Sequence, residues 1–239
     1  MTAPVAGPEL LGRAYSLVTA AVEDLAPPEL LLGTRCRGWT VQDLVFHQLL
    51  DAQRALVAFA TPSGQEPDVD AVTYWAPFRP GSAGSGEGGG PGGDDWAGAH
   101  ARFVRVASSA YVDPRTLVSH WRTTCEATVR AAAAADPGGR VSTQGHVLDV
   151  PDFVSTLVVE ATVHHLDLVV ELPPGAPGTA PDPEGLALTR AVLEGIHGEP
   201  LPATWDDTAA VLKGTGRLEL SADDRQQLGA SADRLPLLG

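Results

Sequence analysis

Residues 153–171, with the sequence FVSTLVVEATVHHLDLVVE, form the stretch that decides the fold. As an α-helix this segment would be apolar around most of its circumference, and such a helix is buried among other elements. Glu160, His164 and Asp167 lie inside the run, where burial without partners would cost several kcal/mol. These side chains therefore need partners, and a metal ion is an efficient one.

Working outward, the apolar periodicity predicts further helices on both sides of this segment. The expected spans are residues 10–25, 41–60, 96–110 and 113–135 before it and 186–196 after it, with a short helix opened by Ser221. Thr40 and Asp43 form a capping-box-like pair before the second helix, and Asp152 is expected to cap the helix that contains Glu160. Residues 140–150 are predicted to be a loop.

These elements predict a mainly α fold, in which four antiparallel helices form an up-down four-helix bundle with one long connection and a small C-terminal appendage. We expect the bundle to occupy residues 1–172, a linker residues 173–183, and a small C-terminal domain residues 184–239. Residues 61–95 are expected to form a flexible loop, because they contain a glycine-rich tract. Tyr74, Trp75 and Phe78 precede that tract and could dock on the body as a wall or a lid.

Composition narrows the classes of function. The chain has 239 residues, of which 44% are apolar, so a sizeable core is expected. A formal net charge of −14 repels phosphate backbones and anionic lipid, which argues against nucleic-acid and membrane partners. We find no apolar run that approaches the roughly 18 residues of a membrane span. No secretory signal is apparent and two cysteines form no disulfide framework, so we expect a cytoplasmic protein.

A second motif, Gly-Trp-Thr-Val-Gln-Asp-Leu-Val-Phe-His at residues 38–47, places His47 on the second predicted helix. Glu160 and His164 are four residues apart, so on a helix they point the same way, one turn apart. If the two helices pack with these faces inward, two imidazoles and one carboxylate converge. That ligand set suits zinc, or another divalent metal, with one coordination position left for chemistry.

The pattern Gly-Trp-Thr-Val-x-Asp-Leu-x-x-His at 38–47, together with Glu-x-x-x-His-x-x-Asp at 160–167, resembles the mycothiol-dependent maleylpyruvate isomerase family of the DinB-like superfamily. The resemblance implies a four-helix bundle that holds zinc through His47, Glu160 and His164. It also implies mycothiol or a similar low-molecular-weight thiol as cosubstrate. The C-terminal tail is shorter here than in the isomerase itself, which favours transfer of the thiol over isomerisation.

The expected function follows from that site. Metal coordination lowers the pKa of a thiol enough to deprotonate it at neutral pH, and the thiolate is a nucleophile. We therefore expect a zinc-dependent enzyme that transfers a small thiol to an electrophilic small molecule, or isomerises such a molecule. His47, Glu160 and His164 would act catalytically through the metal.

Three further side chains are candidates for supporting roles. Asp51 and Asp167 each lie about one helical turn from a proposed ligand histidine and would either orient it or be ordinary structural carboxylates. Arg217 is a candidate to bind a carboxylate of the thiol or substrate, with a helix-capping or surface role as the alternative.

Two other classes of protein stay open. Two histidines and a carboxylate also form the iron site of non-haem oxygenases. Alternatively, the bundle is a non-catalytic module that binds a metal or ligand; a closed structural zinc site needs four protein ligands, and His120 is the candidate for the fourth. His100 and His146 are expected in loops or at the surface, and Cys36 and Cys125 as ordinary core residues, with a reactive thiol less favoured. Whether the chain forms a homodimer is left open.

Overall fold

The computed structural model describes residues 5–79, 94–172 and 175–238, and of residues 94–97 only the backbone. Helices make up 62% of the chain, which confirms the predicted mainly α class. The α-helices are α1 (Pro8–Val22), α2 (Val41–Phe59), α3 (Asp94–Ser108), α4 (Pro114–Ala134), α5 (Val150–Leu168), α6 (Pro183–His197), α7 (Asp207–Gly214) and α8 (Ala222–Leu228). The remaining elements are the 3₁₀ helices η1 (Glu29–Leu31), η2 (Thr73–Phe78), η3 (Val169–Glu171) and η4 (Gly229–Arg234) and the strands β1 (Arg140–Thr143) and β2 (His146–Asp149). The glycine-rich tract of the predicted flexible loop and the first two residues of the predicted linker lie outside the described residues.

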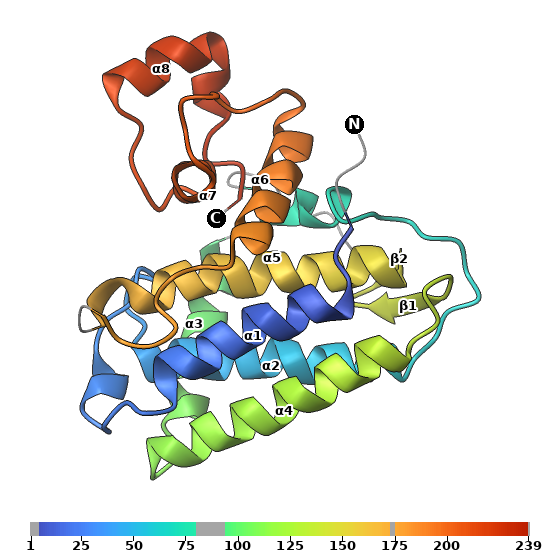
Figure 1. Ribbon diagram of the computed structural model, residues 1–239, viewed down its shortest axis with the longest axis vertical. Coiled ribbons are helices and arrows are strands. Elements are labelled where there is room, and N and C mark those ends of the chain that lie inside the picture. Colours follow the sequence, from blue (N-terminus) through green and yellow to red (C-terminus); the bar gives the residue numbers. More distant parts are fainter. Residues whose placement is uncertain (1–4, 80–93, 173–174, 239) are drawn as a thin grey trace.

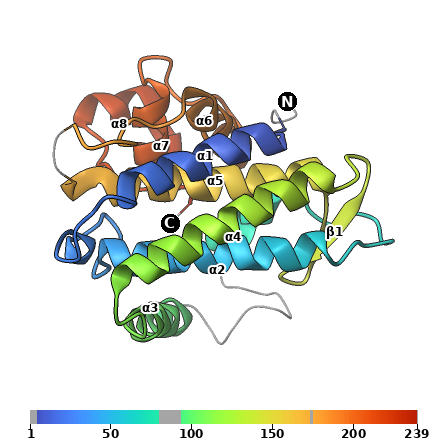
Figure 2. The same cartoon turned by 60° about the horizontal axis from the view of Figure 1, so that its bottom comes forward.

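Helices α1, α2, α4 and α5 form the predicted four-helix bundle (Figures 1 and 2). Two contacts between aromatic rings show how α2 runs relative to α5. The ring centroids of Phe59, at the end of α2, and Phe153, at the start of α5, are 5.3 Å apart. Those of His47, near the start of α2, and His164, near the end of α5, are 4.9 Å apart. α2 therefore runs antiparallel to α5. Figures 1 and 2 show α1 running with α5 and α4 with α2. The expected up-down order, in which each bundle helix runs against the one before it, is therefore wrong for α2 and α4. The long connection through η2 and α3 returns the chain before α4 begins, so these two helices run in the same direction.

Helix α5 is the core helix of the bundle. By length and composition the segment Val150–Glu171 could cross a membrane, since its mean hydropathy reaches 1.4 over an 18-residue window. The expectation that no segment is apolar enough is wrong by this measure, because the valines and leucines outweigh the few polar residues in the average. However, 78% of the window is buried inside the protein, as in the core helix of a folded bundle.

The start of α2 is fixed by the predicted capping box. The Thr40 hydroxyl accepts a hydrogen bond from the Asp43 backbone N–H, and the Asp43 carboxylate accepts one from the Thr40 backbone N–H. Asp43 also accepts a hydrogen bond from the hydroxyl of Ser108, the last residue of α3. The same side chain therefore begins one helix and ties a second helix to it.

The predicted loop at residues 140–150 is wrong, because β1 and β2 form an antiparallel hairpin there. Gln144 and Gly145 make its two-residue turn with φ of 49° and 82°, and the glycine adopts the second of these without a steric cost. α5 begins directly after β2, so Asp149 and not Asp152 occupies the N-cap position. The proline that follows is compatible with the first helical turn, which allows this earlier start.

Helices α6, α7 and α8 pack as a small C-terminal unit on the α5 side of the bundle (Figure 1). Arg217, which follows α7, forms a two-point ion pair with Asp167 on α5 at 2.7 and 2.8 Å. Leu237 and Leu238, near the end of the chain, are also buried. The C-terminal unit is therefore tied to α5 by both apolar contacts and a buried ion pair.

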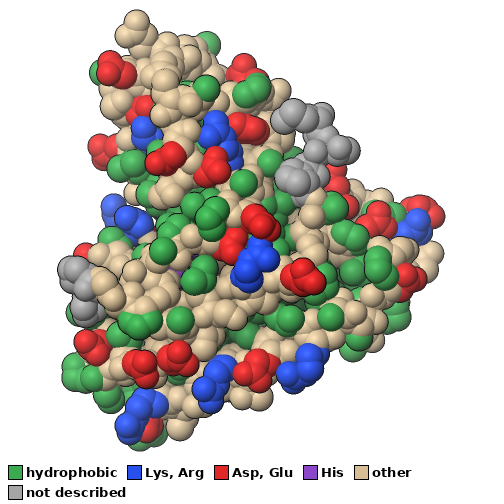
Figure 3. All heavy atoms as spheres, in the orientation of Figure 1, with side chains coloured by type: hydrophobic (Ala, Val, Ile, Leu, Met, Phe, Trp, Pro, Cys, Tyr) green, Lys and Arg blue, Asp and Glu red, His purple; other side chains and the backbone are tan. Residues whose placement is uncertain are grey.

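The surface charge is mixed on the face shown in Figure 3. Acidic side chains there lie among basic and hydrophobic ones and do not gather into one patch. This face therefore offers no platform of a single sign for a charged macromolecule.

Candidate metal centre and cavity

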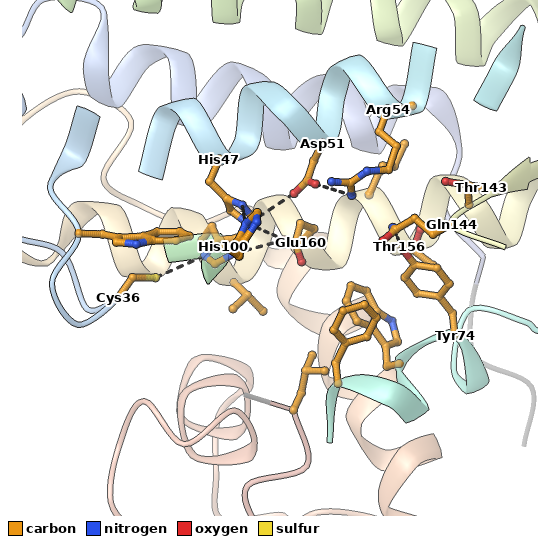
Figure 4. Close-up of a pocket in the computed structure, with 18 of the residues that line it drawn as sticks. Cys36, His47, Asp51, Arg54, Tyr74, His100, Thr143, Gln144, Thr156 and Glu160 are labelled. Atoms are coloured by element: carbon orange, nitrogen blue, oxygen red, sulfur yellow. Dashed lines mark hydrogen bonds and ion pairs between the residues drawn. The ribbon is translucent and has the colours of Figure 1, made fainter. Parts of the chain in front are cut away.

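Helices α2 and α5 bring the three proposed metal ligands together (Figure 4). Nε2 of His47 lies 3.1 Å from Oε1 of Glu160, and Nε2 of His164 lies 3.3 Å from the same oxygen. One ligand atom from each residue lies within 4.8 Å of the other two. Zinc bonds of about 2.1 Å in a tetrahedral arrangement separate ligand atoms by about 3.4 Å. The cluster therefore has the dimensions of a site for one ion.

The other ring nitrogen of each histidine, Nδ1, contacts a residue outside the cluster. Nδ1 of His164 lies 3.0 Å from Oδ2 of Asp167, and Nδ1 of His47 lies 3.3 Å from Nε2 of His100. Because a carboxylate only accepts hydrogen bonds, Nδ1 of His164 must be the donor. In neutral His164 the Nε2 lone pair then faces an oxygen of Glu160. That contact is favourable only with a proton or a metal ion between the two atoms, so the donor set fits a bound cation.

Asp167 is fully buried, and the groups around it keep it ionised. Burial opposes its charge, but hydrogen bonds from His164 and Arg217 outweigh burial and hold the pKa of Asp167 well below its ordinary value. The third guanidinium nitrogen of Arg217 donates to the backbone oxygen of Thr215. Arg217 is thus engaged within the protein and acts on His164 through Asp167, which is neither of the two roles expected from the sequence, a carboxylate-binding role and a helix-capping or surface role.

Charges within the cluster are strongly coupled. Burial opposes the charge on Glu160, but the two imidazoles outweigh it and hold the pKa of Glu160 well below its ordinary value. Burial likewise opposes the charge on His164, but Glu160 and Asp167 raise its pKa well above the ordinary value. The cluster therefore favours positive charge beside Glu160, which a proton on His164 or a divalent cation would supply, and cation binding would displace that proton.

Asp51, one turn after His47, lies next to the same cluster. One of its oxygens is 3.5 Å from Nε2 of His47, and the other is 2.7 Å from Nη1 of Arg54. Burial and the nearby charge of Glu160 raise the pKa of Asp51 to about 6. Oδ2 of Asp51 has no hydrogen-bond partner among the described residues. A cation held by the neighbouring ligands would relieve the repulsion between these two carboxylates.

A cavity of about 460 Å³ borders the cluster, a volume in the range of small-molecule sites. One stripe of α5 forms a wall of it through Phe153, Thr156, Leu157, Glu160, Val163 and His164. Other walls come from Tyr74, Trp75 and Phe78 of η2 and from Arg217 and Leu238 of the C-terminal unit. Figure 4 shows Cys36 at one end of the cavity and Tyr74, Thr143 and Gln144 at the other, with His47 and Glu160 between them.

Cys36 forms a second group with His164 and Asp167 that could hold a metal. Its sulfur lies 3.3 Å from Oδ2 of Asp167 and 3.7 Å from Nδ1 of His164. Because Arg217 already neutralises Asp167, this group needs no further cation, and the group around Glu160 is the better metal site. Cys36 is half-buried and borders the cavity, whereas Cys125 is buried as an ordinary core residue.

Of two further histidines, His100 lies next to the proposed ligands and His120 does not. His100 was expected in a loop or at the surface, but it lies on α3, borders the cavity and packs edge-on against His47 with ring centroids 5.4 Å apart. One signal could have found it: His100 lies four residues, about one helical turn, before Val104, which is fully buried among the described side chains of α3, so the two share a helix face. His120 is exposed on α4 and hydrogen bonds with Tyr111, away from the proposed ligands.

Comparison with known proteins places the chain in a family. A family model described as the mycothiol maleylpyruvate isomerase N-terminal domain matches residues 11–169. The chain belongs to this family. The resemblance inferred from the two motifs is thereby confirmed, and the part that matches the mycothiol maleylpyruvate isomerase N-terminal domain includes His47, Glu160 and His164. No curated protein and no solved structure matches the chain.

Proposed function

We propose that the protein is a metal-dependent enzyme that joins a small thiol, mycothiol or a chemically similar compound, to an electrophilic small molecule. The observation that carries the proposal is the convergence of His47, Glu160 and His164 at the wall of a cavity. These three side chains would hold zinc or another divalent cation with a coordination position left for a ligand. The family match supports a thiol as the cosubstrate.

The residues around the cluster would prepare it for this chemistry. When bound, a zinc ion supplies positive charge that lowers the pKa of a thiol beside it. Asp167 and His100 orient the two imidazoles, and Glu160 supplies the negative charge that balances the cation. The apolar walls of the cavity limit the water around the sulfur, which strengthens these electrostatic interactions.

The bond changes balance without an outside reagent. When the thiol adds to an activated double bond, a sulfur–carbon bond forms and the electron pair of the double bond moves to the neighbouring carbon. That carbon then takes up the proton lost by the thiol. Rotation about the carbon–carbon bond that was the double bond, followed by reversal of these steps, would release the thiol and an isomerised product. The family description makes isomerisation the second candidate function.

His47→Ala tests the proposal most directly. We expect this variant to lose more metal affinity than the roughly 10- to 100-fold that removal of an outer partner costs, because it removes a ligand. Thiol-dependent consumption of N-ethylmaleimide above the spontaneous rate should disappear, while the far-ultraviolet circular dichroism stays helical. Metal content by mass spectrometry and turnover with mycothiol are the measurements.

His120→Ala is the matched control, because His120 is a histidine on a bundle helix outside the cluster. It should keep both metal and activity. Unchanged metal content in His47→Ala would contradict the assignment. Metal loss in His120→Ala would instead favour a closed structural site, and stoichiometric iron with oxygen-dependent turnover would favour an oxygenase.

A further inference from the structure

Asp51 lies beside the proposed metal ligands with one carboxylate oxygen that has no hydrogen-bond donor. Oδ2 of Asp51 is 3.5 Å from Nε2 of His47, the nitrogen that would bind the ion. Asp51 is only 8% exposed, and Oδ2 is buried without a hydrogen bond among the described residues. A buried carboxylate oxygen needs a donor or a cation, so this oxygen calls for a partner.

The position of Oδ2 relative to His47 matches the spacing of the other candidate ligand atoms. Nε2 of His47 is 3.1 Å from Oε1 of Glu160, and Nε2 of His164 is 3.3 Å from that oxygen. Atoms that share one zinc ion at about 2.1 Å are about 3.4 Å apart in a tetrahedral arrangement. The 3.5 Å between His47 and Asp51 is therefore the separation expected of two ligands of one ion.

His47 cannot serve as the partner of Oδ2 once an ion is bound. A metal-bound Nε2 carries no hydrogen, so it has nothing to donate to Asp51. Water cannot take its place, because Oδ2 is closed to solvent. The ion itself can reach this position from the cavity, since the side chains of His47 and Glu160 line the cavity and are 13% and 27% exposed. The ion is then the partner that Oδ2 lacks.

Arg54 holds the other oxygen of the same carboxylate. Its Nη1 is 2.7 Å from Oδ1 of Asp51, and Figure 4 shows Asp51 between Arg54 and His47. Carboxylates that bind metals are commonly held by such an outer partner. The charges also suit a thiol, because Glu160 and Asp51 would balance a divalent ion and Arg54 adds one positive charge. A bound thiolate would neutralise that charge.

We propose that Asp51 is a fourth protein ligand of the metal, through Oδ2, and that Arg54 is its positioning residue. The inference rests on the proposed function, because it takes the ion to lie among His47, Glu160 and His164. Catalytic zinc can expand to five ligands, so a position remains for the thiol on the side of the cavity. The complete ligand set is then two imidazoles and two carboxylates.

Zinc affinity, measured by competition with a chelator, tests the two roles. Asp51→Asn should lose more than about 100-fold, because it removes a charged ligand, whereas Arg54→Gln should lose only the roughly 10- to 100-fold typical of an outer partner. Asp24→Asn, at an exposed position after α1, is the matched control and should bind zinc as the wild type does. Circular dichroism checks folding, and Asp51→Ser, a smaller replacement, provides the same test if Asp51→Asn is not folded.

Cobalt binding separates a ligand from a residue that acts through its neighbours. The visible absorption of bound Co²⁺ depends on the atoms that bind the ion, so it should change in Asp51→Asn and stay close to the wild type in Arg54→Gln. An unchanged cobalt spectrum in the Asp51 variant, or zinc losses no larger than those of Arg54→Gln, would overturn the proposal and leave the proposed function standing. A wild type that binds no metal would contradict the proposed function itself.

Discussion

At the scale of single residues, the partner of Nδ1 decides what each histidine of the cluster can offer at Nε2. His164 has the Asp167 carboxylate as this partner, and His47 has His100. Neutral His47 presents a lone pair at Nε2 only when Nδ1 carries the hydrogen, and Nε2 of His100, 3.3 Å away, can accept a hydrogen bond from that N–H. His100 is therefore a positioning residue for the metal site.

Substitution of His100 should weaken metal binding without removing a ligand. We expect His100→Ala to lose about 10- to 100-fold in metal affinity, because His47 then loses the acceptor that fixes its tautomer. His100→Gln keeps a side-chain acceptor of similar reach and should recover part of that affinity. Competition with a chelator of known affinity measures both variants. Equal affinity of His100→Ala and the wild type would show that His47 is oriented without this contact.

The positions of the three proposed ligands could be predicted from the sequence, but most of the residues around them could not. Glu160 and His164 are spaced by one helical turn, so their common direction follows from helix geometry, and the capped segment before His47 predicts a helix for it. His100 follows the glycine-rich tract, and the spacing of that tract does not determine where the next helix packs. Tyr74 and Trp75 were expected to be able to dock on the body as a wall or a lid, and they do line the cavity, but their segment has no period that predicts which face they cover.

At the scale of elements, the cap of α2 positions His47. The helix begins at Val41, and the capping box satisfies backbone N–H groups that the first turn leaves unpaired. Every later residue of α2 takes its direction from that start. The cap therefore supports the site through the stability of the helix rather than through contact with the cluster.

Thr40→Ala should lower the free energy of unfolding by about 1 kcal/mol, because it removes the side-chain acceptor of the cap. Urea unfolding followed by circular dichroism measures this change. Thr123→Ala, at an exposed position inside α4, is the control and should change stability by less than about 0.5 kcal/mol. If Thr40→Ala lost metal at unchanged stability, the cap would act on the site itself, contrary to this expectation.

Element prediction succeeded for long periodic segments and failed for short ones. α5 could be predicted because its apolar residues continue over five turns, which no loop sustains. The hairpin of β1 and β2 was missed because each strand has four residues, too few to establish a period. Its signal was the pair Gln144-Gly145 between Val-Ser-Thr and His-Val-Leu, a short turn flanked by strand-forming residues.

At the scale of the whole molecule, the C-terminal unit completes the site. Arg217 neutralises Asp167 from 50 residues away in the sequence, and Leu238 forms part of the cavity wall. Helical periodicity relates residues within a few turns, so the sequence could not pair these two charges. The bundle alone would leave Asp167 buried with only His164 to balance it.

The C-terminal unit has its own buried charge at Asp224. The Asp224 carboxylate accepts hydrogen bonds from Lys213, Ser221 and Trp205 at 2.5 to 2.8 Å. Burial opposes its charge, but these hydrogen bonds outweigh burial and hold the pKa of Asp224 well below its ordinary value of 3.8. A carboxyl group with a lowered pKa in the folded state stabilises that state above the unfolded pKa. This stabilisation is lost as the pH falls through the folded pKa.

Asp224→Asn should therefore lower the free energy of unfolding by about 2 kcal/mol at pH 7, because the charged hydrogen bonds are lost. The difference from the wild type should shrink as the pH falls below about 4, because the unfolded wild-type chain then takes up a proton at Asp224 that the folded carboxylate does not. Urea unfolding at several pH values between 7 and 3 measures both effects, with Asp223→Asn, on the exposed side of α8, as the control. A constant difference across this range would mean that Asp224 acts through its shape and not its charge. A matching loss of metal at low pH in the variant alone would show that the C-terminal unit holds the site in place through Arg217.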